Sequence, residues 1–301
     1  MRNINRTKLE KELPEDVVKT LRKKVIPLFK KRLSARKLLP VINTDMRSRE
    51  FGYDRELAGD MQDAQIVAPG GDIPSDSPKG RERILNAIHK IAKQYKIPRE
   101  DYINRNYRTQ SVNKTVRKVA EKDNSVIING EDTAGIPGLV DIPAGSIGPT
   151  NGKWDDNSED GGTPYHDLVR LLKQLRNQSN GAFGQNPKAL TLVIDPLTET
   201  DLYMTHLAET ATDTNTMSKI QKLFGRVLIC PALTEGDLYL METGREIGEL
   251  VIAEDLTIER ADYIKKNQTY LGNIYERVLP VWYQHGETAG KSTAIAELTG
   301  V

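Results

Sequence analysis

Apolar residues recur at helical spacing in residues 14–37, near the start of the chain. Val18, Leu21 and Val25 lie three or four positions apart, with lysines and arginines between them, a pattern typical of an amphipathic helix. The proline and two acidic residues that open the stretch suit a first helical turn. We expect Pro27 to kink or interrupt the helix, since a proline ring clashes with the preceding turn.

A second pattern of this kind predicts a helix over residues 111–129. Ser111 is the expected N-cap, because its hydroxyl can accept a hydrogen bond from the first turn. Gly130 is the expected end of the helix. The buried stripe is predicted to consist of Val112, Val116, Val119, Ala120, Val126 and Ile127.

The rest of the chain mixes helical and extended patterns without a regular βαβ repeat, so we predict an α+β fold. A helix is predicted over 163–178, with Thr163 as its cap and Pro164 at its first position. Residues 83–97 fit either a helix or a strand followed by a helix, and a helix start is expected in 97–106. Further helices are expected at 198–209 and 217–224, and strands at 38–42, 190–196, 226–231, 237–243, 248–261 and in parts of 269–284.

Residues 43–82 show no clear amphipathic helix and end in the turn-rich run PGGDIPSDSPKG, 69–80. A structureless stretch of this length is unusual inside a compact domain. We therefore predict that it projects from the body as a binding loop or a long hairpin.

Composition places the chain among ordinary soluble proteins, with 38% hydrophobic and 28% charged residues. No apolar run approaches the ~20 residues needed to span a bilayer. The start of the chain lacks the apolar core of a secretory signal, so nothing in it indicates export. Cys230 is the only cysteine, which excludes an internal disulfide and any multi-cysteine metal site and suits a reducing compartment.

Charge is distributed unevenly along the chain. Residues 1–37 hold thirteen Lys and Arg and four Asp and Glu, a net charge of +9, whereas the other 264 residues hold 30 basic and 38 acidic side chains, a net charge of −8. A basic arm on an acidic body can bind nucleic acid, an anionic membrane or an acidic surface of a neighbouring subunit. A solvated helix face explains the same residues, and the apolar stripe within them is interpreted as a packing face rather than a membrane anchor.

Two motifs resemble ligand sites, and both are interpreted as loops. GETAGKST, 286–293, has only three residues between its glycines, whereas a phosphate-binding loop needs four, and ten residues after Lys291 leave no room for the required helix and sheet. Calcium-loop positions are occupied in DNSEDGGTPYHD, 156–167, but no helix precedes it and Pro164 interrupts the pattern. The matching positions are Asp156, Ser158, Asp160, Gly161 and Asp167.

No nucleophile or metal constellation is present either. The four histidines, His89, His166, His206 and His285, lack ligand spacing, and Cys230 is interpreted as a small buried apolar residue. We therefore expect no catalytic, cofactor-binding or metal-binding residues, no cofactor, and no enzymatic activity.

The stretch VRKVAEKDNSVIINGEDTAGIPGL, 116–139, resembles the spine helix of encapsulins and of tailed-virus major capsid proteins, in which a helix of the form ARK-A--ED--IF-G leads into a GI-GL turn. Other blocks resemble the same family in the same order. They are SARKLLPV, GGTPYHDLVRLLKQL, LTLVIDP, KLFGRVLICPAL with DLYLMET, and ELVIAEDLTIERADY with VLPVWYQH. Together they cover most of 14–284, and their order and spacing are more specific than any single block.

The resemblance implies the fold of the Hong Kong 97 phage capsid protein (an HK97-like fold). It divides the chain into an N-terminal arm and helix (1–45), an extended loop (46–82), an axial domain (132–235) and a peripheral domain (83–131 and 236–301) that contains the spine helix 111–129. The longer basic arm and the tail at 285–301 depart from typical encapsulins.

The resemblance further implies a structural subunit that assembles with itself into pentamers and hexamers of a closed icosahedral shell. The basic arm favours a tailed-virus major capsid protein enclosing DNA, located in the virion after assembly in the host cytoplasm. The alternative is a cytoplasmic encapsulin enclosing cargo enzymes, with the stripe Val18, Leu21 and Val25 as a cargo groove. No membrane partner is expected.

Overall fold

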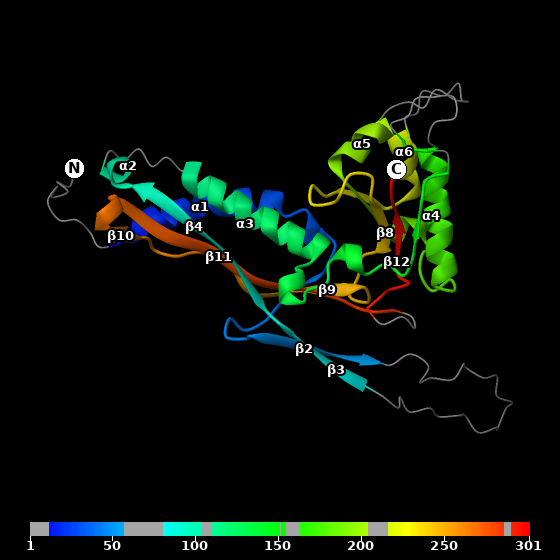
Figure 1. Ribbon diagram of the computed structural model, residues 1–301, viewed down its shortest axis with the longest axis horizontal. Helices are drawn as coiled ribbons and strands as arrows, with labels where there is room; N and C mark the ends of the chain where they lie inside the picture. The colour runs from blue at the N-terminus through cyan, green and yellow to red at the C-terminus, as the bar shows by residue number, and fades with distance from the viewer. Residues whose placement is uncertain are drawn as a thin grey trace.

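The structure is a computed structural model that describes residues 12–56, 81–103, 110–150, 152–154, 163–203, 216–285 and 290–301. Its strands form two five-stranded sheets and a separate two-stranded hairpin (Figure 1). We call the body around the first sheet the peripheral domain and the body around the second the axial domain, after the predicted division.

The peripheral sheet has the strand order β1-β9-β11-β10, with β4 also paired to β11. Its strands are β1 (Val41–Asn43), β4 (His89–Pro98), β9 (Gly248–Ile258), β10 (Asp262–Ile264) and β11 (Thr269–Trp282). The helices of this domain are α1 (Glu15–Arg32), α2 (Arg99–Ile103) and α3 (Gln110–Asn129). Figure 1 shows α1 and α3 running along the sheet, with β4 and β11 beside them.

The spine helix α3 confirms the prediction for 111–129, and its valines are buried as expected from their spacing. The helix begins one residue earlier than predicted, so Ser111 lies inside it rather than at the N-cap. Val112, Val116 and Val119 pack in one cluster with the apolar face of α1 and with β4 and β11. Hydrophobic burial between these layers therefore holds the domain together.

The first helix also differs in one respect from the prediction. α1 continues through Pro27 to Arg32 without interruption.

The strand predicted at 38–42 begins later than expected. Pairing of β1 with β9 begins only at Val41, because Leu38 and Leu39 are buried in the turn that precedes it.

The turn after α3 brings two glycine backbones into contact. Gly130 has a φ of +70°, a conformation that favours glycine. A Cβ on Gly138 would lie 2.2 Å from the Gly130 nitrogen, so only a glycine fits there. The segment GIPGL, which carries part of the family resemblance, thus folds back on the end of the spine helix.

The axial sheet has the strand order β5-β12-β8-β6-β7. Its strands are β5 (Ser146–Ile147), β6 (Leu190–Ile194), β7 (Arg226–Ile229), β8 (Leu238–Glu242) and β12 (Ile295–Leu298). Its helices are α4 (Pro164–Gln178), α5 (Pro196–Tyr203) and α6 (Thr216–Leu223). The predicted helix at 163–178 is confirmed with Thr163 at the N-cap position, although the Thr163 side chain makes no cap hydrogen bond.

Sheet pairing corrects the predicted division of the chain at its C-terminal part. The prediction placed all of 236–301 in the peripheral domain and left 285–301 as a tail. Instead, β8 pairs with β6, and β12 lies between β5 and β8 in the axial sheet. The buried side chains of Ile295, Ala296 and Leu298 explain this return, since they complete the axial core.

The segment from 43 to 98 contains strands, and the helix considered for 83–97 is not formed. Strands β2 (Glu50–Glu56) and β3 (Arg81–Ala87) pair as an antiparallel hairpin. Of the two alternatives predicted for residues 43–82, a binding loop or a long hairpin, this pairing agrees with the hairpin. The residues between them, 57–80, lie outside the described residues. Figure 1 shows the hairpin leaving the body on the side of the sheet away from α3.

Short 3₁₀ helices complete the connections. They are η1 (Ala35–Lys37), η2 (Asp132–Ala134), η3 (Leu139–Asp141), η4 (Pro187–Ala189) and η5 (Lys265–Asn267).

Candidate assembly surfaces

The calcium-like loop is tied to the protein through its last residue. Asp167 is fully buried and accepts hydrogen bonds from the Thr150 backbone nitrogen at 3.1 Å and from the Trp154 indole nitrogen at 3.1 Å. Arg170 adds an ion pair at 3.3 Å. These donors occupy the carboxylate that would have to hold calcium at the last loop position, and Asp156, Ser158, Asp160 and Gly161 lie outside the described residues.

The lysine of the P-loop-like motif is also occupied. Lys291 donates a hydrogen bond of 2.8 Å to the carbonyl oxygen of Asp141, and the neighbouring Ser292 is buried. The motif therefore joins the last segment of the chain to the axial domain. Residues 286–289 of this motif are not described.

Cys230 directly follows β7 and is fully buried, and this burial raises the pKa of its thiol and disfavours the thiolate. His89, His166 and His285 lie on β4, on α4 and near the end of β11, and His206 is outside the described residues. Within the described parts of the chain, no three His, Cys, Asp or Glu side chains gather as metal ligands.

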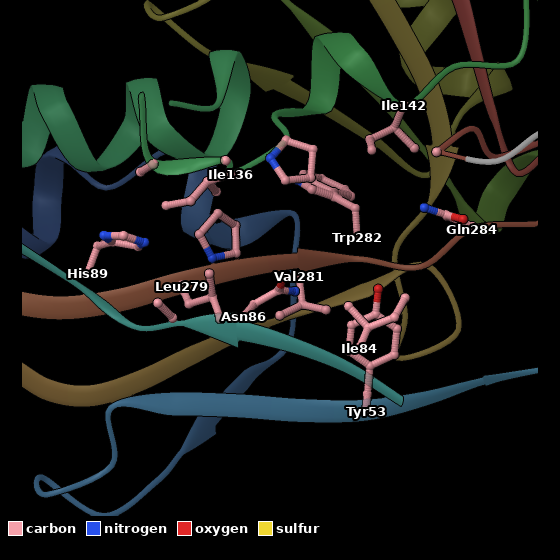
Figure 2. A pocket seen from close by; sticks show the side chains of 16 residues that line it. Tyr53, Ile84, Asn86, His89, Ile136, Ile142, Leu279, Val281, Trp282 and Gln284 are labelled. Atoms are coloured by element: carbon pink, nitrogen blue, oxygen red, sulfur yellow. The ribbon is translucent and has the colours of Figure 1, made fainter. Parts of the chain in front are cut away.

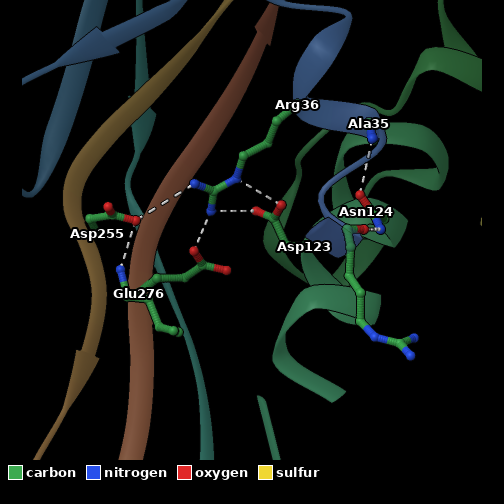
Figure 3. Close-up of polar contacts among 8 residues, drawn as sticks. Ala35, Arg36, Asp123, Asn124, Asp255 and Glu276 are labelled. Carbon is green, nitrogen blue, oxygen red and sulfur yellow. Dashed lines mark hydrogen bonds and ion pairs between the residues drawn. The ribbon is translucent and has the colours of Figure 1, made fainter. Parts of the chain in front are cut away.

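A buried ionic cluster, which the sequence did not predict, joins three elements (Figure 3). Arg36 of η1 donates two hydrogen bonds to Asp123 of α3, at 3.0 and 3.2 Å, and one to Glu276 of β11. Both carboxylates are fully buried, whereas Asp255 of β9, 3.8 Å from Arg36, is largely exposed. The next residue of α3, Asn124, bonds to the Ala35 nitrogen and to the last carbonyl of α1.

Charge balance in this cluster is incomplete, since one arginine faces two buried carboxylates. Burial, together with the charge of Asp123, raises the pKa of Glu276 to about 8, and Arg36 only partly offsets this. At neutral pH, removing the arginine would leave the buried carboxylate of Asp123 without a counter-charge, which costs roughly 3–5 kcal/mol. The cluster therefore fixes the segment after α1 against the spine helix and the sheet.

The stripe considered as a cargo groove is not an open surface. Val18, Leu21 and Val25 are all buried in the cluster that α1 forms with α3. The spacing correctly predicted a packing face, and the alternative of a groove at these three residues is wrong because α3 covers them.

A pocket of about 160 Å³ lies where the hairpin meets the body (Figure 2). Tyr53 and Ile84 come from the two hairpin strands, Ile136 from the turn after α3, and Leu279 and Trp282 from the end of β11. Tyr53 also makes an edge contact with Tyr283, with ring centroids 5.1 Å apart. The hairpin base is thus seated on the body by apolar contacts.

Large apolar side chains are exposed on two helices of the axial domain. Tyr165 and Val169 of α4 are 43% and 40% exposed, and Leu197 and Tyr203 of α5 are 57% and 51% exposed. The other apolar residues of α4, and Leu202 of α5, are buried in the axial core. Exposed apolar groups on both flanks of one domain suit contacts with further copies of the chain.

Sequence reasoning missed these surfaces, although a signal was present. Tyr165 and Val169 are four residues apart and therefore lie side by side on α4, outside the arc of buried leucines. An apolar pair outside the buried face of a helix is a signal for a contact surface.

Comparison with known proteins identifies the family. The model of the family described as "Encapsulating protein for peroxidase" matches residues 5–278. This chain belongs to that family. A comparison with curated proteins finds no relative of this chain.

Solved structures of shell proteins share the fold. A virus-like particle protein from Pyrococcus furiosus is 14% identical, with a TM-score of 0.63 over 94% of this chain and 99% of that one. The capsid protein of a native GTA particle, computed with C5 symmetry, is 16% identical, with a TM-score of 0.65 over 89% and 90%. The capsid protein of Myoviridae phage XM1 is 11% identical, with a TM-score of 0.59 over 87% and 90%. The HK97-like fold expected from the sequence is confirmed.

Among the described residues, no helix is both long enough and apolar enough to cross a membrane.

Proposed function

We propose that this chain is a structural subunit that associates with copies of itself into a closed shell. The observation that carries the proposal is the family match over residues 5–278, on a chain that folds like the subunits of assembled capsids. Two features agree with it: a hairpin that leaves the body, and apolar side chains exposed on the axial domain.

We infer that the subunit has a structural role and no catalytic one. In support, Glu276, a carboxyl whose pKa is strongly raised, is bonded to an arginine inside the protein rather than facing a cleft. Asp167 and Lys291, from the two motifs that resembled ligand sites, are likewise engaged by neighbouring groups.

For the contents of the shell, the family match favours a protein guest, and the chain would then be an encapsulin in the cytoplasm. A second candidate is a tailed-virus major capsid protein enclosing DNA, favoured by the net charge of +9 in residues 1–37. Phosphate neutralisation requires only distributed Lys and Arg, so such an arm can act without a defined pocket.

The test is to purify the particles from their native source. Size-exclusion chromatography with light scattering and electron microscopy should show hollow, roughly spherical particles; a well-folded monomer at all concentrations and salt conditions would contradict the shell. An abundant guest protein with little nucleic acid identifies an encapsulin, and nuclease-protected DNA identifies a capsid. In the second case, neutralising Arg2, Arg6, Lys8 and Lys11 together should weaken DNA association and reduce its dependence on salt.

A further inference from the structure

We propose that neighbouring copies in the shell meet head-to-tail, with α4 of one axial domain packed against α5 of the next. This inference rests on the proposed shell function. It names the two surfaces through which subunits would contact one another within the pentamers and hexamers of the shell.

The first surface is the outer face of α4. Tyr165 and Val169 are one turn apart and exposed, whereas Leu168, Leu171 and Leu175 point into the axial core. Lys173, one further turn along, continues the exposed face. The resulting surface is apolar at one end and cationic at the other.

A groove runs beside this face, between α4 and β5. Arg170, Lys173 and Asn177 line it together with Ile147. Gln174 also lines it, and its Oε1 atom is buried without a hydrogen-bond partner in the described part of the chain. A buried acceptor without a partner is costly, so a donor from a neighbouring subunit would stabilise it.

The second surface is the outer face of α5. Leu197 and Tyr203 are exposed, whereas Thr198 and Leu202 of the same helix are buried. The hydroxyl of Tyr203 donates to Glu199 at 3.2 Å, which holds the ring along the exposed face. This second surface is therefore also apolar and fixed in place.

Charges on the two helices are opposite in sign. α4 carries Arg170, Lys173 and Arg176, and its one acidic residue is buried. α5 carries Glu199 and Asp201 and no basic residue. Complementary charge guides the docking of such faces and disfavours contact between two copies of the same face.

The positions of α4 and α5 in the axial domain favour a ring of subunits over a two-fold symmetric pair. In Figure 1, α4 lies on the right edge of the axial domain and α5 on its upper left. Helix α6 contacts both of them and lies between them. Two different faces on opposite flanks produce a heterologous contact, which closes into a ring when the rotation between copies allows it.

One arm of the experiment weakens each face separately. Val169→Glu and Leu197→Lys give each face a charge of the same sign as the opposing helix, while both side chains are exposed enough for the subunit to fold. Each should raise the subunit concentration at which particles form about tenfold, equivalent to about 1.4 kcal/mol per subunit. Val169→Ile and Leu197→Met are the matched controls and should assemble like the wild type.

A second arm tests which faces meet. Val169→Cys and Leu197→Cys in one chain should give a ladder of covalent oligomers with a short bis-maleimide reagent, whereas either single variant should give none. Wild-type protein controls for Cys230, which is fully buried. Crosslinking by Val169→Cys alone would overturn the head-to-tail contact, as would a double variant without a ladder in particles that assemble. Wild-type protein that stays monomeric would overturn the shell function itself.

Discussion

Arg36 donates two hydrogen bonds to Asp123, 3.0 Å from its Nε and 3.2 Å from its Nη2, across 87 positions of the chain. The same guanidinium also bonds to Glu276, so the segment after α1 is held to both the spine helix and the long strand β11. Two buried carboxylates against one arginine make the stability of this junction sensitive to pH.

Stability should therefore fall as pH rises. Glu276 has a pKa of about 8 when folded, against 4.5 for an ordinary glutamate, so the folded protein binds more protons between these values. The stabilising effect is complete below about pH 4.5 and is lost as pH rises through about 8. We expect the thermal midpoint to drop between pH 5.5 and pH 8.5, by the equivalent of a few kcal/mol.

Glu276→Gln removes the titrating group and should flatten this dependence, leaving the variant more stable than the wild type at pH 8.5. The control is Asp262→Asn, at an exposed position on β10 of the same sheet. A wild-type midpoint that rises over this range would contradict the assignment.

The spine helix should not tolerate a charge on its buried face. Val116 and Val126 are 1% and 5% exposed, so Val116→Asp or Val126→Asp buries an unpaired carboxylate and should destabilise by several kcal/mol. Urea unfolding monitored by circular dichroism measures the loss. Lys114→Asp puts the same charge on the exposed side of α3 and is the control; normal folding and assembly of either valine variant would show the helix register to be wrong.

The glycine contact after the spine helix should be equally strict. Gly138→Ala would bring a Cβ within 2.4 Å of the Ile128 oxygen and the Asn129 carbonyl carbon, so the turn must move. We expect a lower thermal midpoint or insoluble protein. Gly148→Ala, where nothing lies within 4 Å of the added atom, should behave like the wild type.

Deleting residues 60–78 should leave the subunit folded but impair closure of the shell. The hairpin base keeps its contacts, because Phe51 and Tyr53 pack against the core cluster that contains Ile88 and Val251. Near-UV circular dichroism should be unchanged while the particle fraction falls. Complete particles from the deletion variant would rule out a role of this segment in closure.

The acidic loop 156–167 should not bind calcium tightly. Asp167 is already bonded to Thr150, Trp154 and Arg170, so freeing it for a metal would break buried hydrogen bonds. Calorimetry should show no saturable binding below roughly millimolar calcium, the weak end of known sites. Tight binding that disappears in Asp156→Ala with Asp160→Ala would contradict this.

Elements whose residues contact one another locally were predictable from the sequence alone. The periodicity of α3 and α4 and the apolar runs at 190–196 and 248–261 predicted helices and strands close to those observed. Here the local pattern and the burial agree, because each element presents one face to a core. The order of these blocks also carried the family resemblance.

Tertiary contacts decided the remainder. Residues 89–97 are extended because β4 pairs with β11, almost 180 positions away, and residues 83–87 are extended because β3 pairs with β2, and not because of their own pattern. The segment at 295–298 joins the axial sheet because its backbone pairs with β5 and β8 and its apolar side chains are buried in the core. The pKa of Glu276 arises from the burial that brings Arg36 and Asp123 to it, and the covered stripe on α1 arises from the position of α3. Such outcomes depend on contacts between residues that are far apart in the chain. The free energy of these contacts cannot be deduced from the pattern of a local stretch of sequence.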